Sequence, residues 1–380
     1  MFHLLTKVKS KGLAWLWARI RRELRNPTIR PLRIIIDAVL GAKALTTRSF
    51  RRNEDPDRMY AIYDLEICPI TYNFVEFLID AEYESRKAKK NGFVVVFVPH
   101  SESVDPSRVW AEYDAVFDAT SRAWRFQNIV MPLTALSPHC KGVYMLPSRG
   151  QAKVFARRHD VYPRLYDGVN LRTTDMIEFN RKFSRPGLFD GLQAQPQGLR
   201  YIKNWAELNG VVHPLVTITI RDNGFDPLRN SNVDAWVRFA HYIKTSGFCP
   251  VIIPDTDKAL ERDVRFDGLL QLQECAWNLG LRMALYEFAF LNMFVANGPA
   301  SLAIYSPRCS YVCMAGPPQG IVHTVENYKI MNRGEGTDSA WVEPHQRTTV
   351  KSDSYENIVA EFEGHLSRVH LLPASRLEST

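Results

Sequence analysis

The sequence has no long hydrophobic run. Its longest candidate, IIIDAVLGA at residues 34–42, contains Asp37 and falls short of the roughly 20 apolar residues that a membrane-spanning helix needs. No continuous apolar segment followed by an A-x-A site occurs near residue 1, so we expect no secretory signal peptide. With 46% hydrophobic and 23% charged residues, the 380-residue chain has the composition of an ordinary soluble protein with room for two domains.

Cysteine is scarce. The six cysteines lie mostly inside apolar runs, and Cys309 and Cys313 form a C-x3-C pair with no second pair and no His cluster nearby. A zinc site is therefore not expected. Reduced thiols in a cytosolic protein are the simpler interpretation.

Several ligand-binding motifs are also missing. The chain contains neither the G-x-G-x-x-G of dinucleotide-binding enzymes nor the G-x-x-x-x-G-K-[ST] of P-loop proteins. Asp255-Thr256-Asp257 matches a D-x-D metal motif in its letters only. No combined aromatic and basic motif supports nucleic acid as a partner, and no internal repeat appears.

Positive charge, in contrast, is concentrated near the N-terminus. Residues 1–52 hold 13 Lys or Arg side chains against two acidic ones, about +11 in a chain whose total is +7. Apolar residues recur among them at helical spacing, namely Leu13, Leu16, Trp17, Ile20 and Leu24. A basic amphipathic helix of this kind suits an anionic membrane surface, bound through residues 1–30. It suits equally a helix that packs on its own domain with a solvated charged face, and both interpretations stay open.

From residue 58 the hydrophobic pattern alternates between strands and helices. MYAIYD (59–64) precedes a helical stretch over about 73–90, which Asn91-Gly92 closes, and the continuous apolar run FVVVFVP (93–99) follows. This order predicts a βαβ unit, and the unbroken β-branched run indicates a parallel strand buried on both faces. We also expect strands at NIVMPL (128–133) and GVYMLP (142–147), and an irregular segment with a linker over 148–200.

The second half restarts the same rhythm. Strands are expected at LVTITI (215–220), CPVIIPD (249–255), MFVAN (293–297) and SYVCMA (310–315). Helices are expected at about 233–245, in pieces over 258–292, at 299–305 and at 355–369. Two such halves in series predict an α/β protein of two doubly wound domains that face a central cleft, where ligands bind at the carboxyl ends of the strands.

The predicted boundaries follow from this pattern. They are a basic helical extension at 1–55, a first domain at 56–200, a second domain at 205–350, a C-terminal helix at 351–370 and a disordered tail at 371–380.

Side chains that directly follow a strand are the candidates for the site. The first half supplies groups that can accept a proton, Asp64, Glu66 and His100, with Ser148 and Arg149 also in the cleft. The second half supplies groups that hold negative charge or hydrogen-bond a ligand: Arg221, Asp222, Arg229, Asn230, Asp255, Glu287 and the turn Asn297, Gly298, Pro299, Ala300 and Ser301. The carboxylates of Asp64, Asp222 and Asp255 can equally cap the elements that follow them. A structural or surface role is the favoured alternative for His100, and Glu287 can face solvent instead of the pocket. Together the two sets fit group transfer from a nucleotide-activated donor.

The second half also resembles the donor-binding domain of GT-B glycosyltransferases. VANGPASLA (295–303) matches the pattern xxGPxxxA, in which a strand, a Gly-Pro turn and a short helix lie under the donor. The helix MALYE (283–287) and the strand VTITIRD (216–222) are similar to elements of that domain. Residues 229–257 and 63–82 resemble bacterial surface-polysaccharide glycosyltransferases, and the resemblance covers about residues 58–345.

This resemblance implies two Rossmann-like domains, a nucleotide-sugar as co-substrate, and a glycan or lipid-linked acceptor in the bacterial cytoplasm or at the inner face of its membrane. It implies no bound metal or other cofactor. Retaining members often carry a Glu-x7-Glu pair, but Val295 stands eight residues after Glu287, so we expect an inverting reaction. Asp64, Glu66 or His100 would then take the acceptor proton. Arg221 and the 297–301 turn would stabilise the leaving diphosphate. A nucleotide-sugar 2-epimerase of the same fold and a non-catalytic membrane-associated scaffold are the alternatives.

Overall fold

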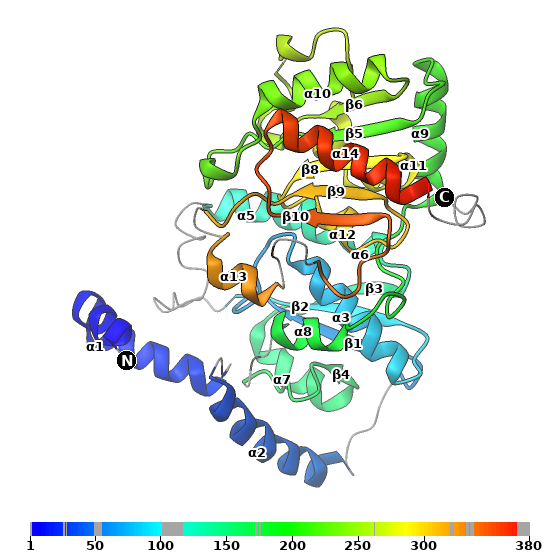
Figure 1. Cartoon of the computed structure of the whole chain (residues 1–380). Helices are drawn as coiled ribbons and strands as arrows, with labels where there is room; N and C mark the ends of the chain where they lie inside the picture. Colours follow the sequence, from blue (N-terminus) through cyan, green and yellow to red (C-terminus); the bar gives the residue numbers. More distant parts are fainter. Residues whose placement is uncertain are drawn as a thin grey trace. The chain divides into compact units, whose positions relative to one another are not determined.

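The computed structural model (Figure 1) describes most of the chain. The described residues are 2–48 (apart from 26 and 28), 55–100, 117–261 (apart from 170, 172, 173 and 175) and 263–370 (apart from 320–322, 332, 333 and 335–337). The predicted disordered tail at 371–380 lies outside them.

The chain divides into two compact units. The first comprises Met1–Phe126 and His139–Thr174, and the second comprises Gln127–Pro138 and Asp175–Thr380. This division differs from the predicted boundary at residue 200. The reason is packing, since α6 (Met131–Leu136) and α9 (Pro196–Leu208) both lie against α11 (Leu279–Phe288) of the second unit.

The first unit begins with two helices, α1 (Phe2–Arg25) and α2 (Arg30–Arg48). Gly12 interrupts the regular geometry of α1, because its φ of 79° lies in the left-handed region that a helix does not use. Among the described residues, no helix combines the length and the hydropathy that crossing a bilayer requires.

The sheet of the first unit has four parallel strands in the order β3-β2-β1-β4. Their bounds are β1 Met59–Asp64, β2 Phe93–Val98, β3 Cys140–Met145 and β4 Val161–Tyr162. Every residue of β2 is buried, as the continuous apolar run predicts for a central parallel strand. The other helices described in this unit are α3 (Phe74–Lys87), α5 (Ala119–Arg125) and α7 (Arg149–Arg158), and α3 makes the expected βαβ connection.

The predicted strand at 128–133 is wrong. Phe126–Val130 form a π-helical turn that continues into α6. The buried residues there are Ile129, Val130, Leu133 and Leu136, which recur at the period of a helix. The short strand β4, within a segment expected to be irregular, takes the fourth place in the sheet instead.

The second unit contains a six-stranded parallel sheet in the order β10-β9-β8-β5-β6-β7. Its strands are β5 Leu215–Thr219, β6 Cys249–Ile253, β7 Leu270–Gln271, β8 Leu291–Val295, β9 Tyr311–Met314 and β10 Gln346–Thr349. The four strands expected in this half are all present. The chain leaves β5 toward β6 and β7 and returns to build β8, β9 and β10 on the other side. The direction of winding therefore reverses between β5 and β8.

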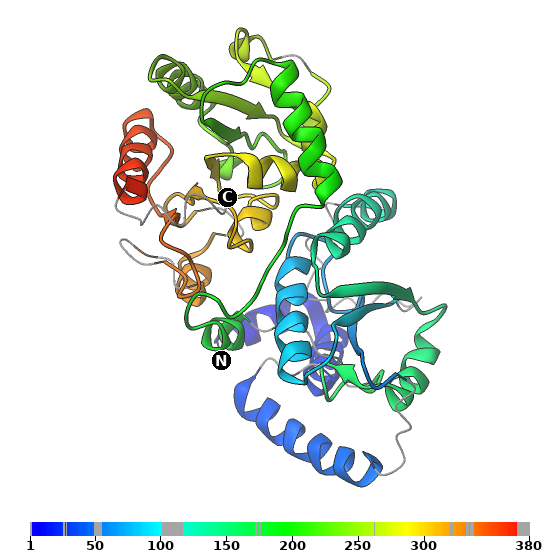
Figure 2. The same ribbon diagram turned by 90° about the vertical axis from the view of Figure 1, so that its right-hand side faces the viewer.

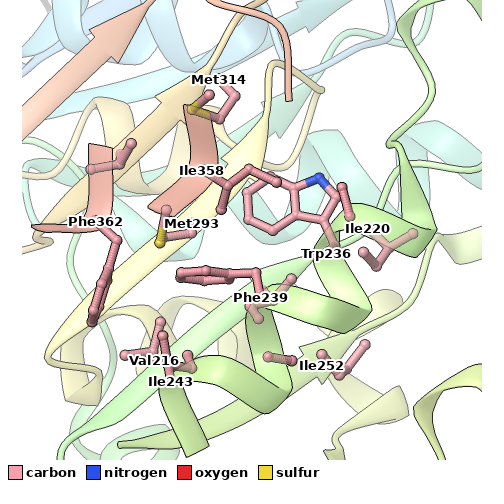
Figure 3. Packing of buried hydrophobic residues seen from close by; sticks show 14 of the residues in the cluster. Val216, Ile220, Trp236, Phe239, Ile243, Ile252, Met293, Met314, Ile358 and Phe362 are labelled. Atoms are coloured by element: carbon pink, nitrogen blue, oxygen red, sulfur yellow. The ribbon is translucent and has the colours of Figure 1, made fainter. Parts of the chain in front are cut away.

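Helices cover both faces of this second sheet. Figure 2 shows α14 (Tyr355–His370) and α9 on opposite sides of the strands. On one face, α10 (Val233–Thr245) and α14 pack Trp236, Phe239 and Phe362 onto the strands (Figure 3). Burial of these large side chains holds the strands rigidly, so the loops at the strand ends start from fixed positions. The remaining helices of the unit are α8 (Met176–Lys182), α12 (Ser301–Ile304) and α13 (Val325–Ile330).

The six cysteines are all among the described residues, and no disulfide joins them. Burial raises the pKa of the Cys275 thiol to about 12, so this side chain stays protonated as an apolar core residue.

Candidate functional site

In each of the two sheets there is one pair of neighbouring strands at which the direction of winding reverses. Polar side chains lie near both of these reversal points. In the first unit this point lies between β1 and β4, which pair in parallel. Asp64 is the last residue of β1, and Tyr166 follows β4 at a short distance along the chain. In open α/β sheets, ligands bind outside the carboxyl ends of strands at such points.

Asp64 is enclosed by hydrogen-bond donors. Its side chain is fully buried and accepts from Arg149 Nη1 at 2.6 Å and Nη2 at 3.0 Å, a bidentate ion pair. The Tyr166 hydroxyl donates to Asp64 Oδ2 at 2.7 Å, and the backbone N–H of Glu66 donates to Oδ1 at 3.0 Å. Each oxygen of the Asp64 carboxylate therefore accepts two hydrogen bonds from groups of its own unit. These contacts give Asp64 a structural role, which does not fit the predicted general base.

The charge of Asp64 raises the pKa values of its two side-chain partners, Arg149 and Tyr166. Burial lowers the pKa of Arg149, but the hydrogen bond and the negative charge of Asp64 outweigh it, so that pKa is raised. Burial and the same carboxylate raise the pKa of Tyr166, which keeps the phenol protonated as a donor. Arg149 also donates to the carbonyl of Pro99 at 2.8 Å and so ties the ends of β1 and β2 together.

Two of the proton acceptors predicted for this unit are not fully buried. The Glu66 side chain is 17% exposed, and its Oε2 lies 4.0 Å from Arg149 Nη1. His100 is half-buried, two residues after the end of β2. Ser148 precedes the first residue of α7, but its side chain makes no capping hydrogen bond. Glu66 follows β1, one of the two strands at the winding reversal, whereas His100 follows β2, and this position makes Glu66 the better candidate for proton transfer.

In the second unit the reversal lies between β5 and β8. These strands pair in parallel from Val216↔Leu291 to Thr219↔Phe294, so Arg221 and the 297–301 turn lie at the same edge of the sheet. That arrangement is the one the sequence predicts. The hydrogen bonds of Arg221 and of the 297–301 turn differ from those predicted.

Arg221 is used inside its own loop. The residue is 6% exposed, and its guanidinium donates to Asn230 Oδ1 and to the carbonyls of Phe225 and Asp226. Its backbone N–H donates to Ser231 Oγ at 2.9 Å. Burial lowers the pKa of Arg221, and nearby aspartates, Asp255 first among them, oppose this. The guanidinium predicted to meet the diphosphate instead shapes the loop 222–231.

The same loop is fixed at its other side by Asp255. Its carboxylate accepts from the backbone N–H of Asp222 at 3.1 Å and from that of Asp257 at 3.3 Å. Asp255 therefore caps the turn after β6, the simpler of the two roles expected for it. Asp226 adopts a φ of 56° in this loop, which is uncommon for a residue with a side chain.

Arg229 connects this loop to the neighbouring strand. Its Nη2 donates to the carbonyl of Ala296 at 2.9 Å, directly after β8, and its Nη1 lies 3.9 Å from Asp226 Oδ2. The Arg229 side chain is 12% exposed. Gln319, in the loop after β9, donates to the carbonyl of Leu228 at 2.9 Å. Loops from β5, β8 and β9 therefore meet around Arg229.

The backbone N–H groups that open α12 are bonded locally. Asn297 Oδ1 accepts from Ala300 N at 2.8 Å, Ser301 N donates to the Gly298 carbonyl, and Leu302 N donates to the Pro299 carbonyl. Pro299 has no N–H, and α12 has only four residues. The predicted cradle of helix-opening amides is therefore largely closed. The turn contributes shape and side chains rather than a row of donors.

Glu287 lies at the opposite edge of the second sheet. It belongs to the last turn of α11, which ends just before β8 begins, so it stands near the amino ends of the strands. Its Oε1 accepts from Ala194 N at 2.7 Å, and Arg308 Nη1 lies 3.8 Å from Oε2. Burial raises the pKa of this carboxyl. The predicted donor-binding role of Glu287 does not fit this position.

Three residues of these sites were not predicted: Tyr166, Asp226 and Gln319. Tyr166 lies in VYPRLYDG, where an aromatic hydroxyl soon after a two-residue strand was the available signal. Gln319 stands in GPPQG after β9, a strand-end loop like those selected elsewhere. Asp226 carries no comparable sequence signal, since its left-handed backbone and the hydrogen bond from Arg221 to its carbonyl are features of the folded loop.

Comparisons with known proteins complete the description of these sites. Neither the protein-family models nor the curated proteins provide a match. The chain is similar to the structure of a glycosyl transferase family 9 protein from Veillonella parvula, with 9% identity and a TM-score of 0.49 over 86% of this chain and 92% of that one. It is similar to ADP-heptose LPS heptosyltransferase II of E. coli, with 12% identity and a TM-score of 0.49 over 82% and 99%. It is also similar to E. coli heptosyltransferase WaaC with ADP, with 13% identity and a TM-score of 0.39 over 81% and 99%. All three of these structural neighbours are glycosyltransferases by description.

Proposed function

We propose that this chain is a glycosyltransferase that moves a sugar from a nucleotide-sugar to a glycan or lipid-linked acceptor in bacterial surface polysaccharide synthesis. One observation supports it above the others. At the winding reversal of the second sheet, loops from three strands meet around Arg229, beside the Asn297–Ser301 turn. This is the position at which doubly wound sheets bind nucleotides.

Arg229 is the residue we assign to the donor diphosphate. Its guanidinium lies against the carbonyl of Ala296 and thus beside the turn. A positive charge so placed stabilises the departing nucleoside diphosphate, and one well-placed group contributes about 3–4 kcal/mol in a transition state. Arg221 and Asn230 support this site indirectly, because they hold the loop that carries Arg229.

Glu66 is the residue we assign to the acceptor hydroxyl. Asp64 accepts hydrogen bonds from Arg149 and Tyr166 and is fully buried, whereas the Glu66 side chain is 17% exposed and follows β1 at the winding reversal. A positioned general base contributes roughly 10²–10⁴ in rate. The same proposal includes a direct displacement with inversion and without a bound metal. It also includes a reaction in the cytoplasm or at the inner face of its membrane.

A nucleotide screen tests the proposal. Nucleoside diphosphates of each base are added to the full chain, and the unfolding temperature is measured. A ligand at 100 times its Kd stabilises the folded protein by about 2.7 kcal/mol. Arg229→Ala should remove the shift, while Arg200→Ala, an exposed arginine on α9, should keep it.

The other outcomes identify the rival functions. If no nucleotide shifts the unfolding temperature, a non-catalytic scaffold is the better description. If a nucleotide-sugar is converted to its 2-epimer with no acceptor present, the chain is an epimerase. A glycosyltransferase needs an acceptor and at most hydrolyses the donor slowly on its own.

A further inference from the structure

The helix α2 carries its apolar residues on its most exposed face. The exposed positions follow the spacing of a single helical face and include no charge: Pro31, Ile34, Ile35, Ala38, Val39 and Ala42. The side chains of Ile34, Ile35 and Val39 are 62%, 61% and 64% exposed. A contiguous apolar face of this kind is uncommon on a protein surface that contacts only water, and it marks an interaction site.

The helix α1 has the same character. Four large apolar residues are exposed at the spacing i, i+4, i+7 and i+11, namely Leu13, Trp17, Ile20 and Leu24. Leu13 and Trp17 are 69% and 67% exposed. Tryptophan is enriched at the boundary between water and lipid, because its ring is apolar and its N–H is polar.

The charges around these faces are strongly positive. The two acidic residues of the segment are each paired within their own helix, Glu23 with Arg19 at 2.9 Å and Asp37 with Arg33 at 3.8 Å. Residues 1–52 keep a net charge of about +11. Two exposed apolar faces therefore lie within the most basic part of the chain.

We propose that α1 and α2 together dock the chain on an anionic lipid bilayer, lying in the headgroup region with their exposed faces inserted. Apolar residues supply burial in the acyl boundary, and the basic residues are attracted to anionic headgroups. A second copy of the chain would fit the apolar faces less well, because it would bring two strongly positive segments together. The docking surface depends on the two helices alone and holds whether or not the chain transfers a sugar.

Vesicle sedimentation of the full chain tests this surface. Vesicles of phosphatidylcholine alone are compared with vesicles that also contain phosphatidylglycerol, at low and high salt. The protein should sediment with the anionic vesicles, and salt should weaken the binding. The double variant Ile35→Glu with Val39→Glu should lower the affinity for anionic vesicles by at least roughly tenfold, since it places charge on the inserted face.

The matched control is Leu208→Glu with Leu260→Glu, which alters residues of the second unit that are 88% and 87% exposed. This control should bind vesicles as the unchanged protein does. Circular dichroism should show that all variants keep their helices. Equal sedimentation of both double variants would overturn the proposal, as would a lack of binding by the unchanged protein. A dimer in lipid-free solution that Ile35→Glu with Val39→Glu dissociates, without vesicle binding, would assign the surface to a second copy and also overturn it.

Discussion

The carboxylate of Asp64 and the guanidinium of Arg149 are 85 positions apart in the sequence and form a bidentate ion pair in the structure. Removing one member of such a pair leaves an uncompensated charge in a buried place, which costs about 3–5 kcal/mol. Arg221 is a comparable case in the second unit, because carbonyl and amide oxygens accept hydrogen bonds from its buried guanidinium. At both positions a charged residue at a strand end stabilises structure rather than facing a ligand.

We therefore expect Arg149→Met to lower the free energy of unfolding by about 3–5 kcal/mol at neutral pH. The double variant Asp64→Asn with Arg149→Met should cost less than the sum of the two single changes, because both remove the same interaction. Urea unfolding measures these values. The control is Arg157→Met on the exposed side of α7, which should change the free energy of unfolding little. Additive costs for Asp64 and Arg149 would contradict the coupling.

At the scale of elements, α14 is attached to the sheet partly through a buried histidine. His365 is fully buried, and its Nε2 lies 3.2 Å from the hydroxyl of Ser310, just before β9. Burial lowers the pKa of His365 from 6.5 to about 3, and the charges of Arg368 and His345 act in the same direction. The folded state thus favours the neutral imidazole, so α14 packs best where His365 carries no proton.

The pH dependence follows from the sign of this shift. Since the pKa is lower in the folded state, the contribution of His365 is complete above about pH 6.5 and is lost as the pH falls toward 3. In that window its loss approaches about 1.4 kcal/mol per pH unit. We expect His365→Gln to flatten the fall in the free energy of unfolding between pH 6.5 and pH 4, measured by urea titration. His213→Gln, at an exposed position, should leave the slope unchanged. An equally steep slope in both variants would argue against this role.

At the scale of the whole molecule, each unit has a parallel sheet of its own. In the second unit, one hydrophobic cluster joins buried residues of four strands, β5, β6, β8 and β9, with α10 and α14, as Figure 3 illustrates for Trp236 and Phe362. Domains with separate cores commonly unfold separately. The donor site proposed around Arg229 belongs to the second unit alone.

Calorimetry of the full chain should accordingly show two unfolding transitions. A nucleoside diphosphate that binds should raise the transition of the second unit and leave the other near its original temperature, because it stabilises only the unit to which it binds. Arg149→Met should lower the transition of the first unit and so identify it. A single transition that moves as a whole in both experiments would contradict the separate cores.

The sequence alone predicts much of this architecture. The strands at 93–98 and 215–219 and the helix at 233–245 appear where the pattern places them, because unbroken β-branched runs and an amphipathic period are local properties. The list of strand-end residues also follows from local pattern, since parallel strands present their carboxyl ends at one edge. The two parallel α/β sheets were thus determined by hydrophobic patterning.

Only the tertiary structure decides what each of those residues contacts. Asp64 pairs with Arg149, Arg221 binds its own loop, and Glu287 stands at the amino edge of the strands. The segment at 128–133 is helical, and α6 packs against α11, which lies far along the chain. Burial and pairing depend on groups that lie far apart in sequence, and a charged side chain takes whichever partner the fold brings to it. For this reason the local pattern indicates where a site lies, and the packing determines which residues are left to act there.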